Sequence, residues 1–233
     1  MSRHDEIAAG LATTREQIAI ACREAGRGVD EVTLTVVTKF FPASDVRILA
    51  DLGITDVGEN RHQEAEAKAA ETADLRLRWH YIGGLQSNKA AAVARYADVV
   101  ESIDRPKLVK GLSRGAVERG AAVSCLLQVS LDPPEQREGR AGVHPDDLLA
   151  LADEVADAEG LQLSGLMAVA PLGADANEAF ARLAGIADRF RTEHPGATVL
   201  SAGMSGDLEA AIRHGATHVR IGRAVLGERP VVK

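Results

Sequence analysis

A regular alternation of short apolar segments with helical ones constrains the fold more than any other feature of this sequence. The apolar segments are residues 34–40, 56–59, 78–83, 98–104, 121–130, 161–171, 198–204 and 218–225. Most of them are continuous apolar runs, as expected for strands that are covered on both faces. The segments between them resemble helices; residues 43–53, for example, have Ser44 as a candidate N-cap and end at Gly53.

Strands that alternate with helices of about ten residues or more indicate parallel βα units. Eight such units within 233 residues predict an α/β fold, a single (β/α)8 TIM barrel over residues 32–227. Residues 1–30 add an N-terminal helix, whose buried face is expected to carry Ile7, Leu11 and Ile18. A doubly wound open sheet is the alternative architecture.

Composition excludes several classes of function. The formal net charge is −7 and aromatic residues make up 3% of the chain, which argues against nucleic-acid binding through a basic face or a base-stacking platform. No apolar run approaches the roughly 20 residues of a membrane helix, so we expect a cytoplasmic protein without a membrane partner. Cys22 and Cys125 are expected to be buried, reduced thiols. His214 and His218 have metal-like spacing, but Gly215 interrupts the helix between them, so no metal site is predicted.

Lys39 ends the first apolar segment, and active sites of this kind of barrel form at the C-terminal ends of its strands. Low-dielectric surroundings disfavour the charged form of a lysine, and an amine with a lowered pKa can form a Schiff base with an aldehyde. Position alone allows a second interpretation, in which the ammonium group simply reaches solvent at the end of the strand.

Residues 202–227 add two features to the same rim. Ser205 is predicted to open a helix, so that its hydroxyl and the first helical amides form an anion site, although plain capping of the helix uses the same geometry. Arg220 interrupts an apolar strand and needs a polar partner, either an ion pair at the rim or a ligand. The loops after strands seven and eight form the usual phosphate site of this barrel. Residues 131–142, rich in Pro, Gly and charge, are predicted to form a flexible loop over this face.

Five motifs, in one order, cover nearly the whole chain. They are VVTKFFP at residues 36–42, GENRHQE at 58–64, WHYIGGLQSNK at 79–89, GLMAVAP at 165–171 and LSAGMSGDLEAAIRHGATHVRIGRAVLG at 200–227. Together they resemble the pyridoxal phosphate homeostasis proteins, the YggS/PROSC family. A collinear set of this kind is far more specific than a single glycine pattern.

The resemblance implies a barrel related to the N-terminal domain of alanine racemase, with pyridoxal 5′-phosphate (PLP) bound as a Schiff base to Lys39. It implies that Ser205 and the backbone around Gly222 and Arg223 hold the phosphate, and that Arg220 faces the pyridine nitrogen. It also implies that Asn60 lies beside the cofactor and that Met204 packs near it, with Ser201 in the neighbourhood of the phosphate.

The chain departs from the usual family pattern at three positions. Gly84 replaces the usual histidine of the third motif, so the role of that histidine at the mouth of the site is open. Arg223 replaces a threonine, which preserves a backbone amide but removes a hydroxyl. Ala202 replaces a methionine, which we interpret as a change in packing.

The resemblance implies a protein that holds and releases PLP in vitamin B6 homeostasis without catalytic turnover, with PLP-dependent apoenzymes as candidate recipients. An arginine at the pyridine nitrogen keeps that nitrogen unprotonated and limits carbanion stabilisation. We expect a monomer, since a closed barrel has no free strand edge.

Two enzymatic alternatives remain. A PLP-dependent amino-acid racemase needs an acid or base on each face of the substrate carbon. In alanine racemase one of these is a tyrosine from a second domain or a neighbouring subunit, whereas the tyrosines of this chain are Tyr81 and Tyr96. A class I aldolase-like barrel, with a sugar phosphate on Lys39, is the other alternative.

Overall fold

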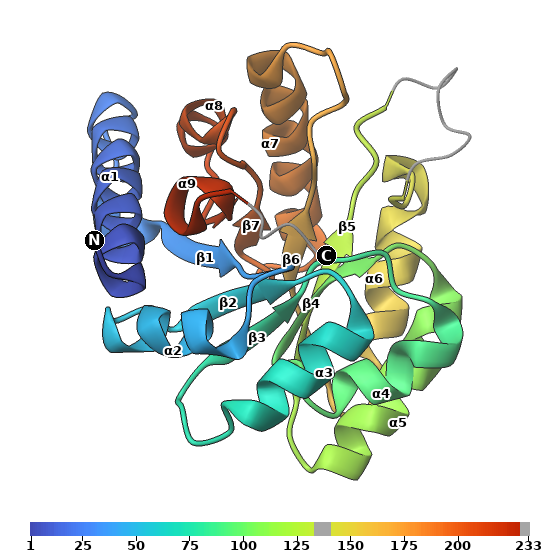
Figure 1. The fold of residues 1–233 in the computed structure, drawn as a ribbon. Coiled ribbons are helices and arrows are strands. Elements are labelled where there is room, and N and C mark those ends of the chain that lie inside the picture. The colour runs from blue at the N-terminus through green and yellow to red at the C-terminus, as the bar shows by residue number, and fades with distance from the viewer. Residues whose placement is uncertain (133–140, 229–233) are drawn as a thin grey trace.

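Parallel strands close into an eight-stranded barrel in the computed structural model, which describes residues 1–132 and 141–228 (Figure 1). The strands are β1 (Thr33–Val37), β2 (Asp56–Glu59), β3 (Arg78–Tyr81), β4 (Val99–Ile103), β5 (Val123–Gln128), β6 (Leu161–Met167), β7 (Val199–Ser201) and β8 (His218–Ile221). They follow one another around the barrel in chain order, and β8 pairs in parallel with β1. This closure confirms the predicted (β/α)8 barrel and excludes the open sheet.

Helices cover the outside of the barrel (Figure 1). They are α1 (Arg3–Glu24), α2 (Ala43–Asp51), α3 (His62–Glu71), α4 (Ala90–Ala94), α5 (Val109–Arg119), α6 (Leu148–Ala156), α7 (Ala176–Glu193), α8 (Leu208–Arg213) and α9 (Arg223–Leu226). Short 3-10 helices are η1 (Val29–Glu31), η2 (Ser87–Lys89), η3 (Pro106–Leu108) and η5 (Pro145–Asp147). None of the described helices has the length and apolar character required to span a bilayer.

The alternation of side chains along each strand separates the helix-facing layer from the barrel interior. In β8, Val219 and Ile221 belong to the apolar cluster that α1 shares with the outer side of β1 and β2. Arg220 lies between them, is buried, and therefore faces the interior. A separate, small apolar cluster inside the barrel is formed by Val99, Leu126 and Met167. Buried polar side chains, Arg220 among them, also lie in this interior and lead to the functional site.

Helix α1 closes the outer layer beside α8 and α9, as Figure 1 shows. The Ser2 hydroxyl caps it by accepting a hydrogen bond from the amide of Asp5, and the Asp5 carboxylate accepts one from the amide of Ser2. The predicted buried face is confirmed, because Ile7, Leu11 and Ile18 are all buried. The helix is shorter than the N-terminal segment predicted from the sequence, since Gly26 turns the chain away with a φ of 67°.

Two predicted helix starts are wrong. Helix α2 begins at Ala43 after the extended residue Pro42, so Ser44 lies within the first turn and is not the N-cap. Ser205 does not open a helix, because residues 205–207 form a turn and α8 begins at Leu208. In that turn the Asp207 carboxylate accepts a hydrogen bond from the Met204 amide at 2.5 Å. Asp207 directly precedes α8, but its side chain makes no capping bond to that helix.

Several strands end before the predicted boundary, among them β1, β6 and β8, which end at Val37, Met167 and Ile221. The residues beyond these ends form the loops of the C-terminal rim, where the barrel carries its site. Of the predicted loop over this rim, residues 133–140 lie outside the described part of the chain.

Candidate functional site

A cavity of about 300 Å³ opens at the C-terminal end of the barrel, between the strands that close it, β1 and β8. Residues predicted from the sequence line most of it, namely Lys39, Met204, Ser205, Arg220, Gly222 and Arg223. Val37, Phe41 and Ile82 supply an apolar wall that the sequence analysis did not anticipate. The cavity thus combines a primary amine, two guanidinium groups, a hydroxyl and an apolar surface.

Lys39 lies in a tight turn that follows β1. The amide of Phe41 donates to the carbonyl of Thr38 at 3.0 Å, and Phe40 between them has a φ of 73°. This left-handed conformation is that of the third residue of a type II turn, where glycine is usual. A phenylalanine there stores strain, and such strain persists where surrounding contacts hold the backbone in place.

A buried ionic cluster holds this turn from β2 and α3. The ammonium group of Lys68 donates to the Thr38 carbonyl at 2.8 Å, to Glu59 Oε1 at 2.7 Å and to Glu64 Oε1 at 2.6 Å. Glu64 Oε1 also accepts from the amide of Phe40 at 2.5 Å. Both peptide groups that flank Lys39 are therefore bound to the same cluster. Sequence reasoning missed Lys68 because a single charge on a helix resembles a solvated residue.

The other side of the cavity consists of the turn after β7 and the chain after β8. Ser205 and Gly206 belong to the turn, and Gly222 directly precedes α9. The first amides of a helix have no partner within the helix, so the start of α9 and the Ser205 hydroxyl offer hydrogen-bond donors. Such donors bind anions, and the Arg223 side chain adds a positive charge. Ser205 keeps its predicted place in the cavity, although not as a helix cap.

Arg220 is held by two hydrogen bonds inside the barrel. One guanidinium nitrogen donates to Ser201 Oγ at 2.7 Å, and the other donates to the carbonyl of Ala168 at 3.0 Å. Burial lowers the pKa of Arg220, and the negative charges of Glu101 and Asp207 oppose that shift. Since these bonds leave further N–H groups of the guanidinium, Arg220 can also donate into the cavity.

Behind Arg220, a chain of hydrogen bonds runs through the barrel interior. Ser201 Oγ donates to Glu101 Oε2 at 2.6 Å, and Glu101 Oε1 lies 2.7 Å from His80 Nδ1. His80 Nε2 lies 2.9 Å from Asp56 Oδ1. Because carboxylates flank both ring nitrogens, both nitrogens donate and the ring is an imidazolium.

The pKa values of this chain agree with its hydrogen bonds. Burial lowers the pKa of His80, but the bonds to Asp56 and Glu101 outweigh it and raise the value to about 8. Burial opposes ionisation of Glu101, yet His80, Arg220 and Ser201 lower its pKa to about 2. Ser201, which joins Glu101 to Arg220, lies behind Arg220 and is not on the cavity wall.

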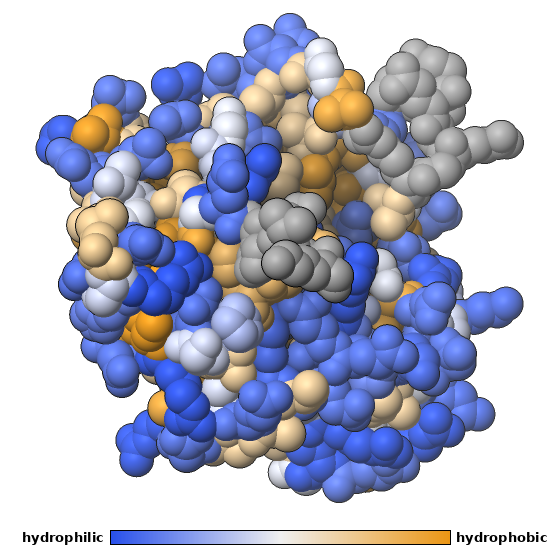
Figure 2. Space-filling view, viewed as in Figure 1, coloured by the Kyte–Doolittle hydropathy of each residue, from blue (hydrophilic) through white to orange (hydrophobic). Residues whose placement is uncertain are grey.

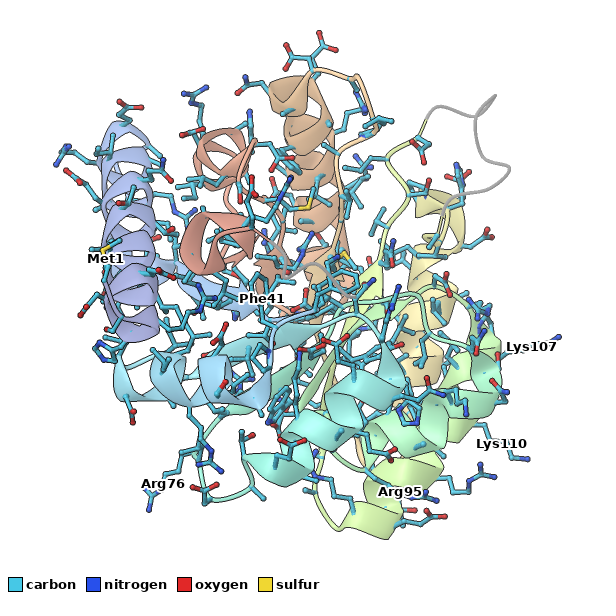
Figure 3. The ribbon with its side chains drawn as sticks, in the orientation of Figure 1. Met1, Phe41, Arg76, Arg95, Lys107 and Lys110 are labelled. Atoms are coloured by element: carbon cyan, nitrogen blue, oxygen red, sulfur yellow. The ribbon has the colours of Figure 1, made fainter. Side chains whose placement is uncertain are left out.

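Charged side chains at the periphery are separate from the cavity. Phe41, on the cavity wall, lies in the middle of the fold, whereas Arg76, Arg95, Lys107 and Lys110 point outward (Figure 3). Figure 2 shows that hydrophilic side chains cover most of the visible surface over α3, α4 and α5. These surface cations are therefore separate from Lys39, Arg220 and Arg223, the cationic groups of the cavity.

Comparison with known proteins agrees with the motifs. Residues 8–230 match the family model of the alanine racemase N-terminal domain. The pyridoxal phosphate homeostasis protein of Mycobacterium tuberculosis is 43% identical to this chain over 243 residues, which cover 97% of the chain and 94% of the relative. The chain belongs to the pyridoxal phosphate homeostasis protein family. The family predicted from the motifs is confirmed.

Solved structures extend this comparison. PipY of Synechococcus elongatus PCC7942, determined with PLP bound, has a TM-score of 0.82 and 37% sequence identity, and the match covers 95% of this chain and 100% of PipY. Alanine racemase from Corynebacterium glutamicum has a TM-score of 0.68 at 17% identity, and the match covers 98% of this chain and 62% of the racemase. The racemase shares the fold, as predicted.

The loop after β3 contains two glycines, Gly83 and Gly84, whose surroundings differ. A Cβ on Gly83 would lie 2.1 Å from the carbonyl oxygen of Asn60, so only glycine allows this loop to approach the loop after β2. Asn60 is thereby fixed at the rim, although it is not part of the cavity wall. Gly84, by contrast, is exposed, and a Cβ there would meet no atom within 4 Å. Its lack of a side chain is therefore not required by packing.

Proposed function

We propose that this chain binds PLP in the cavity between β1 and β8, as a Schiff base on Lys39, and acts in PLP homeostasis without catalytic turnover. The observation that carries the proposal is the common cavity of Lys39 and the donors around Ser205, Gly222 and Arg223. An amine and an anion cradle on one cavity suit a phosphorylated aldehyde. The PLP-bound relative PipY supports the choice of PLP among such aldehydes.

The residues present fit PLP in their chemistry. The amine of Lys39 can bind the aldehyde, the donors near Ser205 and α9 can bind the phosphate, and the apolar wall can cover the ring. Arg220 would face the pyridine nitrogen and Met204 would pack near the ring. Bound PLP supplies an electrophilic imine, and an arginine at the ring nitrogen limits its use as an electron sink.

The composition of the cavity supports binding without turnover. Racemisation needs an acid or base on each face of the substrate carbon. Among the described residues, the titratable side chains on the cavity wall are Lys39, Arg220 and Arg223. Tyr81 is buried in the layer outside the barrel, and Tyr96 stacks on His62, so neither tyrosine of the chain lines the cavity.

Borohydride reduction of the PLP-loaded protein tests the proposal directly. Reduction converts the imine to a stable secondary amine, so we expect peptide mass analysis to find the phosphopyridoxyl group on the peptide that contains Lys39. Buried Lys68 and the exposed lysines serve as internal controls within the same digest. Labelling elsewhere, or none at all, would contradict the proposal.

Turnover on a broad panel of amino acids tests the non-catalytic part. We expect the racemase rate of the PLP-loaded chain to stay at the level of free PLP, because the second acid or base is missing. We expect the same of the decarboxylase rate, because an arginine at the ring nitrogen limits the use of the ring as an electron sink. The measurements are chiral chromatography of each amino acid and quantification of the released amine after extended incubation. Robust turnover of any amino acid would favour the racemase alternative.

The partners belong to the proposal as well. We propose that the chain works as a cytoplasmic monomer that supplies PLP to PLP-dependent apoenzymes. The closed barrel presents no unpaired strand edge to a second copy, which supports the monomer. The free, buried thiols of Cys22 and Cys125 suit a reducing compartment.

A further inference from the structure

Four buried ionised groups lie in series in the interior of the barrel. Asp56, His80, Glu101 and Arg220 are each at most 5% exposed, and Ser201 bridges the last two. Of these, only Arg220 reaches the cavity wall. Buried ion pairs add little to stability compared with a well-packed apolar core. A chain of them that ends at the cavity therefore suggests a role at the site.

We propose that Glu101, held by His80, is a positioning residue for Arg220 that sets the direction of its guanidinium group and the net charge around the PLP ring. This inference rests on the proposed binding of PLP. Glu101 on β4 and His80 on β3 would thus influence the bound PLP although neither side chain lines the cavity.

The geometry gives Glu101 control over the direction of Arg220. A serine hydroxyl has one proton, and that of Ser201 goes to Glu101 Oε2 at 2.6 Å. Its lone pairs then face Arg220, whose guanidinium donates at 2.7 Å. Glu101 Oε2 itself lies 3.8 Å from the same guanidinium nitrogen. The carboxylate thus orients the serine, and the serine together with the Ala168 carbonyl orients the arginine.

His80 controls how much of the Glu101 charge Arg220 experiences. The charged or titratable groups that face His80 are Asp56 on β2, Glu101 on β4 and His218 on β8, whose ring lies 6.2 Å away. Arg78 lies 3.7 Å from Asp56. Burial lowers the pKa of His218, so that ring is neutral near pH 7. When His80 loses its proton, Glu101 keeps its charge but loses its cationic partner, and the cavity becomes more negative.

Two substitutions with opposite expected signs test the inference. The readout is the pH midpoint at which the imine absorbance of the PLP-loaded protein changes. Glu101→Gln makes the cavity more positive, so we expect the midpoint to fall by roughly one pH unit, the scale of one nearby charge. His80→Gln removes a positive charge below pH 8 and should raise it. The control is Glu118→Gln, which removes a negative charge from an exposed carboxylate paired with Arg95. This variant should leave the midpoint unchanged.

A purely structural role would lower the melting temperature of Glu101→Gln without moving the midpoint, and that result would overturn the inference. If both variants fail to fold, the titration of His80 can be followed by NMR in the unmutated protein instead. Linkage is reciprocal, so the titration of His80 near pH 8 should shift when PLP is added, and an identical titration with and without PLP would also overturn it. If the unmutated protein forms no imine at all, the proposed function fails instead.

Discussion

Lys39→Ala is expected to abolish the imine absorbance of the PLP-loaded protein completely. Lys39 is the one lysine on the wall of the described cavity, so no second amine there can replace it. The phosphate donors around Ser205 and α9 remain, and they should still hold some PLP as the free aldehyde. We expect retention of PLP through dialysis to fall at least about tenfold, which corresponds to a loss of about 1.4 kcal/mol in binding free energy.

Lys110→Ala is the matched control, since Lys110 points outward from α5 (Figure 3). This variant should keep both the absorbance and the retained PLP of the unmutated protein. Alanine fits the turn position of Lys39, so the circular dichroism of ligand-free Lys39→Ala should also be unchanged. A Lys39→Ala protein that keeps the imine band would place the Schiff base on another lysine.

The fold was predictable because eight apolar segments, separated by helices, admit few parallel arrangements. The exact ends of the strands were not predictable, and Thr38, Ala168 and Ala202 show the reason. Their amides still donate to the neighbouring strand, to the carbonyls of Gly58, Ser201 and His218. These residues thus keep the hydrogen bonds of a strand although the chain already bends into a loop. No local pattern of residue types distinguishes these two states.

The site was predictable where a single residue carried the signal. Lys39 and Arg220 are charges in apolar segments, and Ser205 lies in the loop region where barrels of this kind usually bind phosphate. Glu101 carries the same signal, within the apolar segment 98–104, yet its meaning depends on a partner 100 positions away, Ser201. Its other partner, His80, lies on a different strand. The sequence contains every member of this chain but does not show which members meet.

The second large effect is expected from Lys68→Met, which removes the cation beneath the Lys39 turn. Glu59 is 1% exposed, and its Oε2 has no hydrogen-bond partner in the described structure. Without Lys68, this carboxylate is a buried charge with no cation beside it. Removing one partner of a buried ion pair costs about 3–5 kcal/mol. In a chain of this length, that lowers the melting temperature by about 6–20 °C.

The pH dependence of this variant has a definite sign. Burial raises the pKa of Glu59, and the charge of Lys68 now opposes that rise. In Lys68→Met the pKa rises further above its value in the unfolded chain. The folded state then takes up a proton more readily than the unfolded state, so stability increases as pH falls. The loss of melting temperature should therefore be smaller near about pH 5 than near about pH 8.

Two further variants separate the buried charge from the cluster as a whole. Glu59→Gln in the Lys68→Met background removes the uncompensated carboxylate, so part of the lost stability should return. Lys110→Met, at the surface, should leave the melting temperature nearly unchanged.

The same cluster also binds both peptide groups that flank Lys39, through the Thr38 carbonyl and the Phe40 amide. Lys68→Met should therefore weaken imine formation as well as the fold, even at temperatures where the protein remains folded. A variant as stable as the unmutated protein, with an undiminished imine band, would show that the strained turn around Phe40 does not depend on Lys68.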